Sequence, residues 1–228
     1  MSELRTRLAE VDENIASAAR RFQRDAAEIT RIVVTKFHPA QLITDLAALG
    51  VHDVGENRQQ ELSQKRAELA DLGGVRWHFI GQAQSNKARQ IRAAADVVHS
   101  VDREKIATAL DAAGEPGGAQ LDVLLQVNLT ADEGRGGVEP ADIEKLATRI
   151  ACLETLRLRG VMAVAPLEED PAPAFARLAG YSDIVRSVVA DARWISAGMS
   201  HDFTEAIAHG ATHLRIGSAI TGTRPARG

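Results

Sequence analysis

Cysteine is almost absent from this sequence, which has a single cysteine, Cys152, among 228 residues. One cysteine cannot form a disulfide within the chain or a cysteine-based metal site, so both are excluded. No apolar run is long enough to span a bilayer, and the first residues, MSELRTRLAEVDENI, form an amphipathic pattern rather than a secretory signal. These absences predict a cytoplasmic protein without membrane contact.

The sequence also has no large excess of charge of either sign. It contains 27 lysines and arginines against 31 acidic residues, and the basic residues form no cluster. Binding to nucleic acids or to anionic membranes needs such clusters, so neither partner is indicated. The expected partner is therefore a small molecule.

Strand-like and helix-like segments alternate along the whole chain. Apolar residues at three- and four-residue spacing, together with proline and glycine breaks, predict helices at 2–28, 39–50, 57–73, 102–113, 140–153, 174–190 and 202–209, and another that begins at Ser85 or Asn86. Short apolar, β-branched runs predict strands at 32–36, 52–55, 77–81, 96–101, 122–128, 156–165, 194–198 and 212–219.

This alternation predicts an α/β protein with a parallel sheet, and eight repeats in this length predict a single-domain (β/α)8 TIM barrel over residues 1–228. The pattern shows no helix after the eighth strand. The outer faces of strands eight and one would then be exposed, so we expect the helix at 2–28 to take the place of the eighth outer helix.

Lys36 is the first candidate site residue. It ends the strand-like part of RIVVTKFHPA, where Pro39 prevents further sheet pairing. In parallel barrels the chemistry lies at the carboxyl ends of the strands. A lysine at this end is a candidate for forming a Schiff base with an aldehyde, although a solvated lysine on the rim is the alternative interpretation.

A candidate phosphate site lies at the last two strands. Ser200 precedes the short helix at 202–209, whose free N–H groups can bind an oxyanion, and Gly217 allows a close approach of the backbone. Barrels of this class often bind phosphate with the loops after strands seven and eight. A small molecule with both an aldehyde and a phosphate is pyridoxal 5′-phosphate (PLP). Alternatively, Ser200 is only a helix cap.

Arg215 lies on the predicted eighth strand. If the alternate residues Leu214 and Ile216 face the helices, Arg215 points into the mouth of the barrel. A guanidinium near the pyridine nitrogen of PLP would oppose protonation there and weaken the ring as an electron sink. The alternative is a core ion pair with Asp53 or Glu56.

Seven segments, which cover nearly the whole chain in order, resemble the pyridoxal phosphate homeostasis protein family, a relative of the N-terminal barrel of alanine racemases. They are VVTKFHP, GENRQQE, WHFIGQAQSNK, HSVD, VNLTADEGRGG, LRGVMAVAP and GMSHDFTEAIAHGATHLRIGSAITGTR. The resemblance implies that Lys36 holds PLP as an aldimine. It further implies that Asn57 lies beside the cofactor, Arg215 near its ring nitrogen, and Ser200, Gly217 and Ser218 around its phosphate. Helix capping is the alternative role for Asn57.

The chain departs from the family pattern at three positions. Gln59 replaces a small apolar residue, Ala83 a leucine or proline, and Thr221 an aromatic residue. None of the three is expected to touch the proposed contacts. Lys87 is expected to be exposed, and a transient second aldehyde site there is a further hypothesis.

The resemblance implies a monomeric binder of PLP that takes part in vitamin B6 homeostasis without efficient catalysis, with PLP-dependent apoenzymes as potential partners. Racemisation needs a second acid or base, which alanine racemases supply as a tyrosine from an additional domain. The single tyrosine here, Tyr181, lies in a predicted helix away from the rim. A weak PLP-dependent racemase or lyase is the alternative, and an aldolase using Lys36 without a cofactor is a third possibility.

Overall fold

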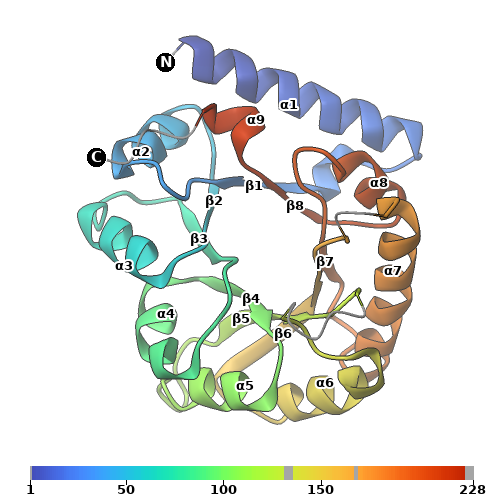
Figure 1. Cartoon of the computed structure of the whole chain (residues 1–228). Helices are drawn as coiled ribbons and strands as arrows, with labels where there is room; N and C mark the ends of the chain where they lie inside the picture. Colours follow the sequence, from blue (N-terminus) through green and yellow to red (C-terminus); the bar gives the residue numbers. More distant parts are fainter. Residues whose placement is uncertain (1, 131–135, 167–168, 224–228) are drawn as a thin grey trace.

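The computed structural model describes residues 2–130, 136–166 and 169–223, and these residues form a closed barrel of parallel strands in sequence order (Figure 1). The predicted (β/α)8 barrel is therefore confirmed. The strands are β1 (Thr30–Val34), β2 (Asp53–Glu56), β3 (Arg76–Phe79), β4 (Val97–Val101), β5 (Leu121–Gln126), β6 (Leu156–Met162), β7 (Trp194–Ser196) and β8 (His213–Ile216).

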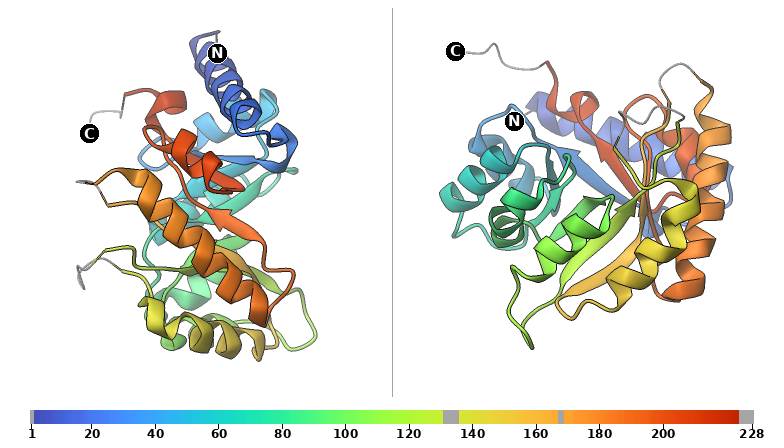
Figure 2. Two further views of the ribbon diagram at one scale, coloured as in Figure 1. Left: turned by 90° about the vertical axis from the view of Figure 1, so that its right-hand side faces the viewer. Right: turned by 60° about the horizontal axis from the view of Figure 1, so that its bottom comes forward.

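Helices surround the barrel on the outside (Figures 1 and 2). They are α1 (Ser2–Arg21), α2 (Ala40–Ala48), α3 (Gln59–Glu68), α4 (Ala88–Ala94), α5 (Glu104–Asp111), α6 (Ile143–Ala151), α7 (Pro171–Val188), α8 (Phe203–Ala208) and α9 (Ser218–Thr221), with short 3-10 turns at Ala26–Glu28, Ser85–Lys87 and Pro140–Asp142. In the described part of the chain, no helix combines the length and apolar character needed to cross a membrane.

The first helix takes the place of the eighth outer helix, as predicted. Leu4, Leu8, Val11 and Ile15 are buried on one face of α1, which lies against α8 and α9 (Figure 1). The helix ends at Arg21 rather than at residue 28, because the chain reverses through Gln23 and Arg24. Gln23 has a φ of 55°, and Arg24 donates to backbone carbonyls of the α8–β8 segment.

Several strands are shorter at the rim than predicted. The strand with Lys36 ends at Val34, and the sixth ends at Met162 rather than at residue 165. Only the backbone N–H of Thr35 still pairs with the neighbouring strand, at 3.0 Å from the Gly55 oxygen. Lys36 therefore lies in the loop after β1 and not in the strand, because the chain turns as soon as the ladder ends.

The predicted helix caps are wrong in two places. Asn57 does not cap α3, whose N-cap position is Arg58 and lacks a side-chain hydrogen bond. Ser85 begins a 3-10 turn, and the α-helix follows at Ala88. The cap of α7 was not predicted: Asp170 accepts from the Ala172 N–H at 3.1 Å, immediately before Pro171.

The amino-terminal end of the barrel is closed by an aromatic and cationic cluster. The guanidinium groups of Arg76 and Arg159 lie 4.9 and 4.4 Å from the centre of the Trp194 ring, and the His213 ring lies 4.3 Å from it. Asp122 accepts hydrogen bonds from Arg76 and from Arg157 on the same side. This cluster lies at the end of the barrel opposite to the predicted site.

The barrel interior contains three buried histidines, and they predict acid sensitivity. Burial lowers the pKa of His78, His99 and His213, in the last case to about 3. Below about pH 6.5 the unfolded chain therefore binds protons that the folded barrel excludes. We expect the free energy of unfolding to fall between about pH 6.5 and pH 3, by at most about 1.4 kcal/mol per pH unit for each histidine.

Urea unfolding at pH 7, 6 and 5 measures this dependence. The His213→Phe variant, which removes one of the three groups, should show a shallower loss. A stability that does not change between pH 7 and pH 5 would contradict burial of the histidines in the neutral form.

Candidate functional site

One cavity brings together five of the six predicted site residues. It lies at the carboxyl ends of β1, β7 and β8 and has a volume of about 290 Å³. Its lining includes Lys36, Ser200, Arg215, Gly217 and Ser218. These residues come from the loops after β1, β7 and β8 and from β8 itself, so the barrel topology places an amine, a guanidinium and a glycine-containing turn around one space.

The turn that carries Lys36 has an unusual backbone. Phe37 has a φ of 67°, in the left-handed region that non-glycine residues rarely adopt. Its N–H donates to the Glu61 carboxylate of α3 at 2.8 Å, and the Arg58 guanidinium lies 5.0 Å from the centre of its ring. Such strain persists only where the surroundings hold it, so these contacts fix the position of the half-buried Lys36.

A buried ion pair supports the same turn from below. The Lys65 Nζ donates to Glu56 Oε1 at 2.7 Å and to the Thr35 carbonyl at 2.9 Å, and the Thr35 hydroxyl donates to the same Glu56 oxygen at 2.6 Å. Burial raises the pKa of Glu56, and the Lys65 charge opposes that rise. The sequence interpretation missed Lys65 and Glu61. The spacing of Glu61 and Lys65 by four residues on one helix is the signal for them.

Replacing Lys65 by methionine should destabilise the protein strongly. The change leaves the Glu56 carboxylate buried without its partner, which costs about 3–5 kcal/mol for a broken buried pair. Urea unfolding at pH 7 measures this loss. The matched control is Lys105→Met, because Lys105 is exposed on α5. Equal stability of the two variants would show that the buried pair does not support the turn.

Arg215 points into the barrel, as its strand parity predicts. It is 5% exposed, its Nη1 donates to Ser196 Oγ at 2.7 Å, and its Nη2 donates to the Ala163 carbonyl at 2.8 Å. Burial lowers the pKa of Arg215 to about 10, and the Asp202 charge opposes this. It therefore carries its charge at neutral pH.

The alternative ion pair of Arg215 with Asp53 or Glu56 is wrong. In the described residues, Asp53 instead bonds His78, and Glu56 bonds Lys65. Both carboxylates already have partners on their own side of the barrel. Arg215 therefore pairs with neither carboxylate and lies among the residues that line the cavity.

The loop after β7 forms one wall of the cavity. The Met199 N–H donates to the Asp202 carboxylate at 2.6 Å, and the Asp202 N–H donates back to the Met199 carbonyl at 3.2 Å. This closed turn places the half-buried Ser200 on the cavity. Ser200 itself is not the cap of α8, because Asp202 occupies that position.

The loop after β8 contains a short helix that the sequence interpretation missed. The eighth strand ends at Ile216, and α9 begins at Ser218 with Gly217 at its N-cap position. Gly217 O accepts from the N–H groups of Ile220 and Thr221. The N–H groups of the first turn, at Ser218 and Ala219, have no acceptor within the helix. This arrangement suits an anion better than the predicted strand would.

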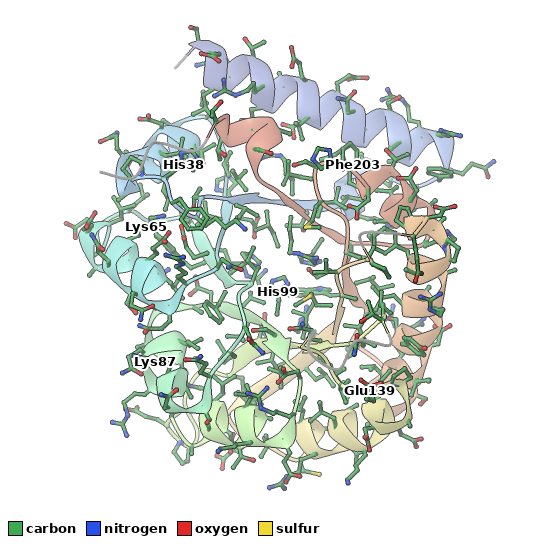
Figure 3. The ribbon with its side chains drawn as sticks, in the orientation of Figure 1. His38, Lys65, Lys87, His99, Glu139 and Phe203 are labelled. Atoms are coloured by element: carbon green, nitrogen blue, oxygen red, sulfur yellow. The ribbon has the colours of Figure 1, made fainter. Side chains whose placement is uncertain are left out.

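Asn57 is not brought into this cavity. It is exposed and lines a separate hollow of about 160 Å³ with Arg58, Gln59 and Lys87. Its place beside a cofactor therefore stays a prediction that only the resemblance supports. Lys87 is half-buried rather than exposed, and it lies on the side of α4 (Figure 3).

Thr221 was expected to lie away from the proposed contacts, but it lines the cavity together with Lys36. The departure from the family pattern at this position therefore changes the wall of the site itself. Ala83, in contrast, is buried in the core. Tyr181 packs against the core from α7, outside the lining of the cavity.

A larger cavity of about 490 Å³ lies between the loops after β4 and β5. Its lining includes Asp102, Arg103, Glu139 and Lys145 but none of the predicted site residues. Both acidic and basic side chains line it, and among the described residues no helix with glycine at its N-cap position borders it. The chemistry of the smaller cavity therefore identifies it as the candidate site.

Comparisons with known proteins show the family to which the chain is related. The family model "Alanine racemase, N-terminal domain" matches residues 6–225. A pyridoxal phosphate homeostasis protein of Pseudomonas aeruginosa is 40% identical over 98% of this chain and 97% of its own, and one of Mycobacterium bovis is 39% identical over 99% and 95%.

A solved structure shares the fold closely. PipY of Synechococcus elongatus PCC7942, whose structure has PLP bound, superposes with a TM-score of 0.84 at 33% identity, over 96% of this chain and 100% of that protein. The full-length match, the closed barrel and the order of the motifs give one conclusion: the chain belongs to the pyridoxal phosphate homeostasis protein family, built on the alanine racemase N-terminal barrel.

Proposed function

We propose that this protein binds PLP in the cavity beside β1, holds it covalently through Lys36, and takes part in intracellular PLP homeostasis. The observation that carries this proposal is the meeting of the half-buried Lys36, the buried Arg215 and the turn at Gly217 and Ser218 in one space. The relationship to PipY, which was solved with PLP bound, supports it.

The residues of the cavity fit the chemical groups of PLP. When bound, PLP supplies an aldehyde carbon to which an amine can bond with loss of water. Lys36 would supply the amine, and the Ser218 N–H with the Ser200 loop would supply donors for a phosphate. Two cationic side chains around the space match the negative charge of the ligand.

Arg215 favours a protein that binds PLP without using it for catalysis. A guanidinium can only donate hydrogen bonds, so it can bind a ring nitrogen only in the unprotonated form of that nitrogen. An unprotonated ring is a weak electron sink. The described residues also place no tyrosine on this cavity, where a racemase would need a second acid or base. We infer a binding role without efficient catalysis.

A trapping experiment tests this function. The wild-type protein is incubated with PLP, reduced with borohydride, digested and mapped by mass spectrometry. We expect one reduced pyridoxyl group per chain, on the peptide that contains Lys36. If no adduct forms after incubation with excess PLP, the proposed function is wrong.

We further propose that the protein acts as a cytoplasmic monomer that can pass PLP to apoenzymes. The cavity is open at the rim, and its ligand would leave by reversal of the same amine chemistry. Reactivation of a PLP-dependent apoenzyme by the loaded protein, compared with an equal amount of free PLP, tests the transfer. A phosphatase that destroys free PLP is added to both reactions. If the loaded protein then reactivates the apoenzyme no faster than free PLP does, direct transfer is wrong.

A further inference from the structure

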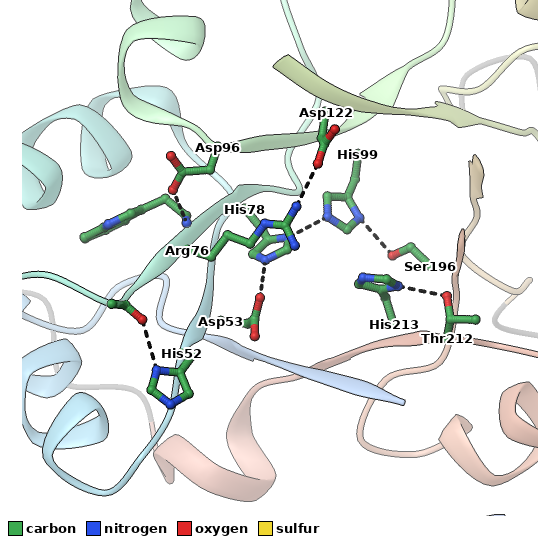
Figure 4. A network of polar contacts seen from close by, with 12 residues as sticks. His52, Asp53, Arg76, His78, Asp96, His99, Asp122, Ser196, Thr212 and His213 are labelled. Atoms are coloured by element: carbon green, nitrogen blue, oxygen red, sulfur yellow. Dashed lines mark hydrogen bonds and ion pairs between the residues drawn. The ribbon is translucent and has the colours of Figure 1, made fainter. Parts of the chain in front are cut away.

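A chain of hydrogen bonds crosses the barrel interior from its amino-terminal end to Arg215. His78 Nε2 lies 2.9 Å from Asp53 Oδ1, and His78 Nδ1 lies 2.9 Å from His99 Nε2 (Figure 4). His99 Nδ1 in turn lies 2.9 Å from Ser196 Oγ, which accepts from Arg215 at 2.7 Å. Five residues on five strands are thereby joined.

The groups at the two ends of this hydrogen-bond chain decide which atom donates in each hydrogen bond. An ionised carboxylate can only accept, and a guanidinium can only donate. Asp53 therefore requires a proton on His78 Nε2, which leaves His78 Nδ1 as an acceptor from His99 Nε2–H. His99 Nδ1 then accepts from the Ser196 hydroxyl, whose oxygen remains free to accept from Arg215. With both imidazoles neutral, only this arrangement satisfies every bond.

Burial keeps the residues of this hydrogen-bond chain in these protonation states. His78, His99 and Ser196 are fully buried. Burial lowers the pKa of both histidines, so each is neutral and has one N–H. Burial alone would raise the pKa of Asp53, but the hydrogen bond from His78 and the charge of Arg76 hold it below its ordinary value. The carboxylate is therefore ionised at neutral pH.

We propose that Asp53, His78, His99 and Ser196 are positioning residues, which act through a one-directional hydrogen-bond chain to present the Arg215 guanidinium to the cavity. The Ala163 carbonyl holds the second terminal nitrogen of Arg215. Among the described residues, these bonds fix two of its five N–H groups, and the others can bind a ligand. The effect on PLP rests on the proposed function, whereas the hydrogen-bond chain itself does not.

The first test uses the ligand-free protein. Nitrogen NMR of protein with 15N-labelled histidine, at pH 7, reports which ring nitrogen carries the proton. We expect His78 and His99 both to carry it on Nε2. A proton on Nδ1 of either residue would overturn the proposal, whether or not the protein binds PLP.

The second test compares two buried histidines. His99→Phe removes the hydrogen bonds that connect His78 to Ser196. His213→Phe is the matched control, because His213 lies inside the barrel but bonds Thr212 and is not part of this hydrogen-bond chain (Figure 4). Since the link orients a charged donor, its loss should weaken PLP binding about tenfold and shift the visible absorption of bound PLP. The control should change neither. Equal effects of the two variants would overturn the proposal.

A substitution at Ser196 covers the case in which His99→Phe does not fold. Ser196→Ala should reproduce the loss of affinity and the spectral shift, and Ser196→Thr, which keeps the hydroxyl, should restore both. Failure of threonine to restore them would show that Ser196 acts by packing alone. If the wild-type protein does not bind PLP, the proposed function is wrong. The NMR result still shows whether the hydrogen-bond chain runs in the proposed direction.

Discussion

Replacing Lys36 by alanine should abolish the proposed covalent attachment of PLP. Lys36 supplies the amine on the cavity that also contains Arg215 and the turn at Gly217. Without this amine, no bond to the aldehyde carbon can form there, although the other contacts still allow weaker, reversible binding. Intact mass after borohydride reduction should therefore show the adduct on the wild-type protein and none on Lys36→Ala.

The matched control for this variant is Lys87→Ala. Lys87 is also half-buried at the rim, but it lines the separate hollow beside Asn57. We expect Lys87→Ala to keep the full adduct, which would also exclude a second aldehyde site at this lysine. If Lys36→Ala retains an adduct equal to that of the wild type, the assignment of Lys36 is wrong.

Deleting residues 1–28 should abolish cooperative folding. The deletion removes α1, whose buried Leu4, Leu8, Val11 and Ile15 pack beside α8 and α9. Burial of four such side chains contributes about 6–12 kcal/mol, at about 1.5–3 kcal/mol each. This is comparable to the whole stability of an ordinary domain, about 5–15 kcal/mol. Thermal unfolding followed by circular dichroism should show no sharp transition.

Single substitutions on α1 provide a graded version of the same experiment. Leu8→Ala should cost about 2–5 kcal/mol, whereas Arg5→Ala on the exposed face should change stability by less than about 0.5 kcal/mol. A truncated protein that remains soluble and unfolds in one sharp transition would show that α1 is dispensable.

The barrel could be predicted because its signals are local. Most strands contain short apolar or β-branched runs, and proline or glycine marks the ends of several helices, so the alternation is visible without tertiary contacts. The orientation of Arg215 could be predicted for the same reason, since parity along one strand decides it. The position of Lys36 was predicted to within two residues of the end of β1.

What could not be predicted depends on contacts between distant segments. The left-handed Phe37 is held by Glu61, which is 24 residues away in the sequence. The short helix α9 consists of residues that also suit a strand, and only the end of the ladder at Ile216 decides between them. His99 and Ser196 are 97 residues apart, and no local pattern relates them.

The contact between the two ends of the fold also affects how the protein is made. Arg7 Nε on α1 donates to the Ile220 carbonyl of α9 at 2.7 Å, across 213 residues. During synthesis α1 leaves the ribosome before its partner helices α8 and α9, which follow more than 180 residues later. The amphipathic helix must therefore remain without its native partners while the barrel elongates, and chains with such distant contacts fold slowly and expose apolar surface meanwhile. The apolar face of α1 thus stays uncovered until α8 and α9 are available to pack against it.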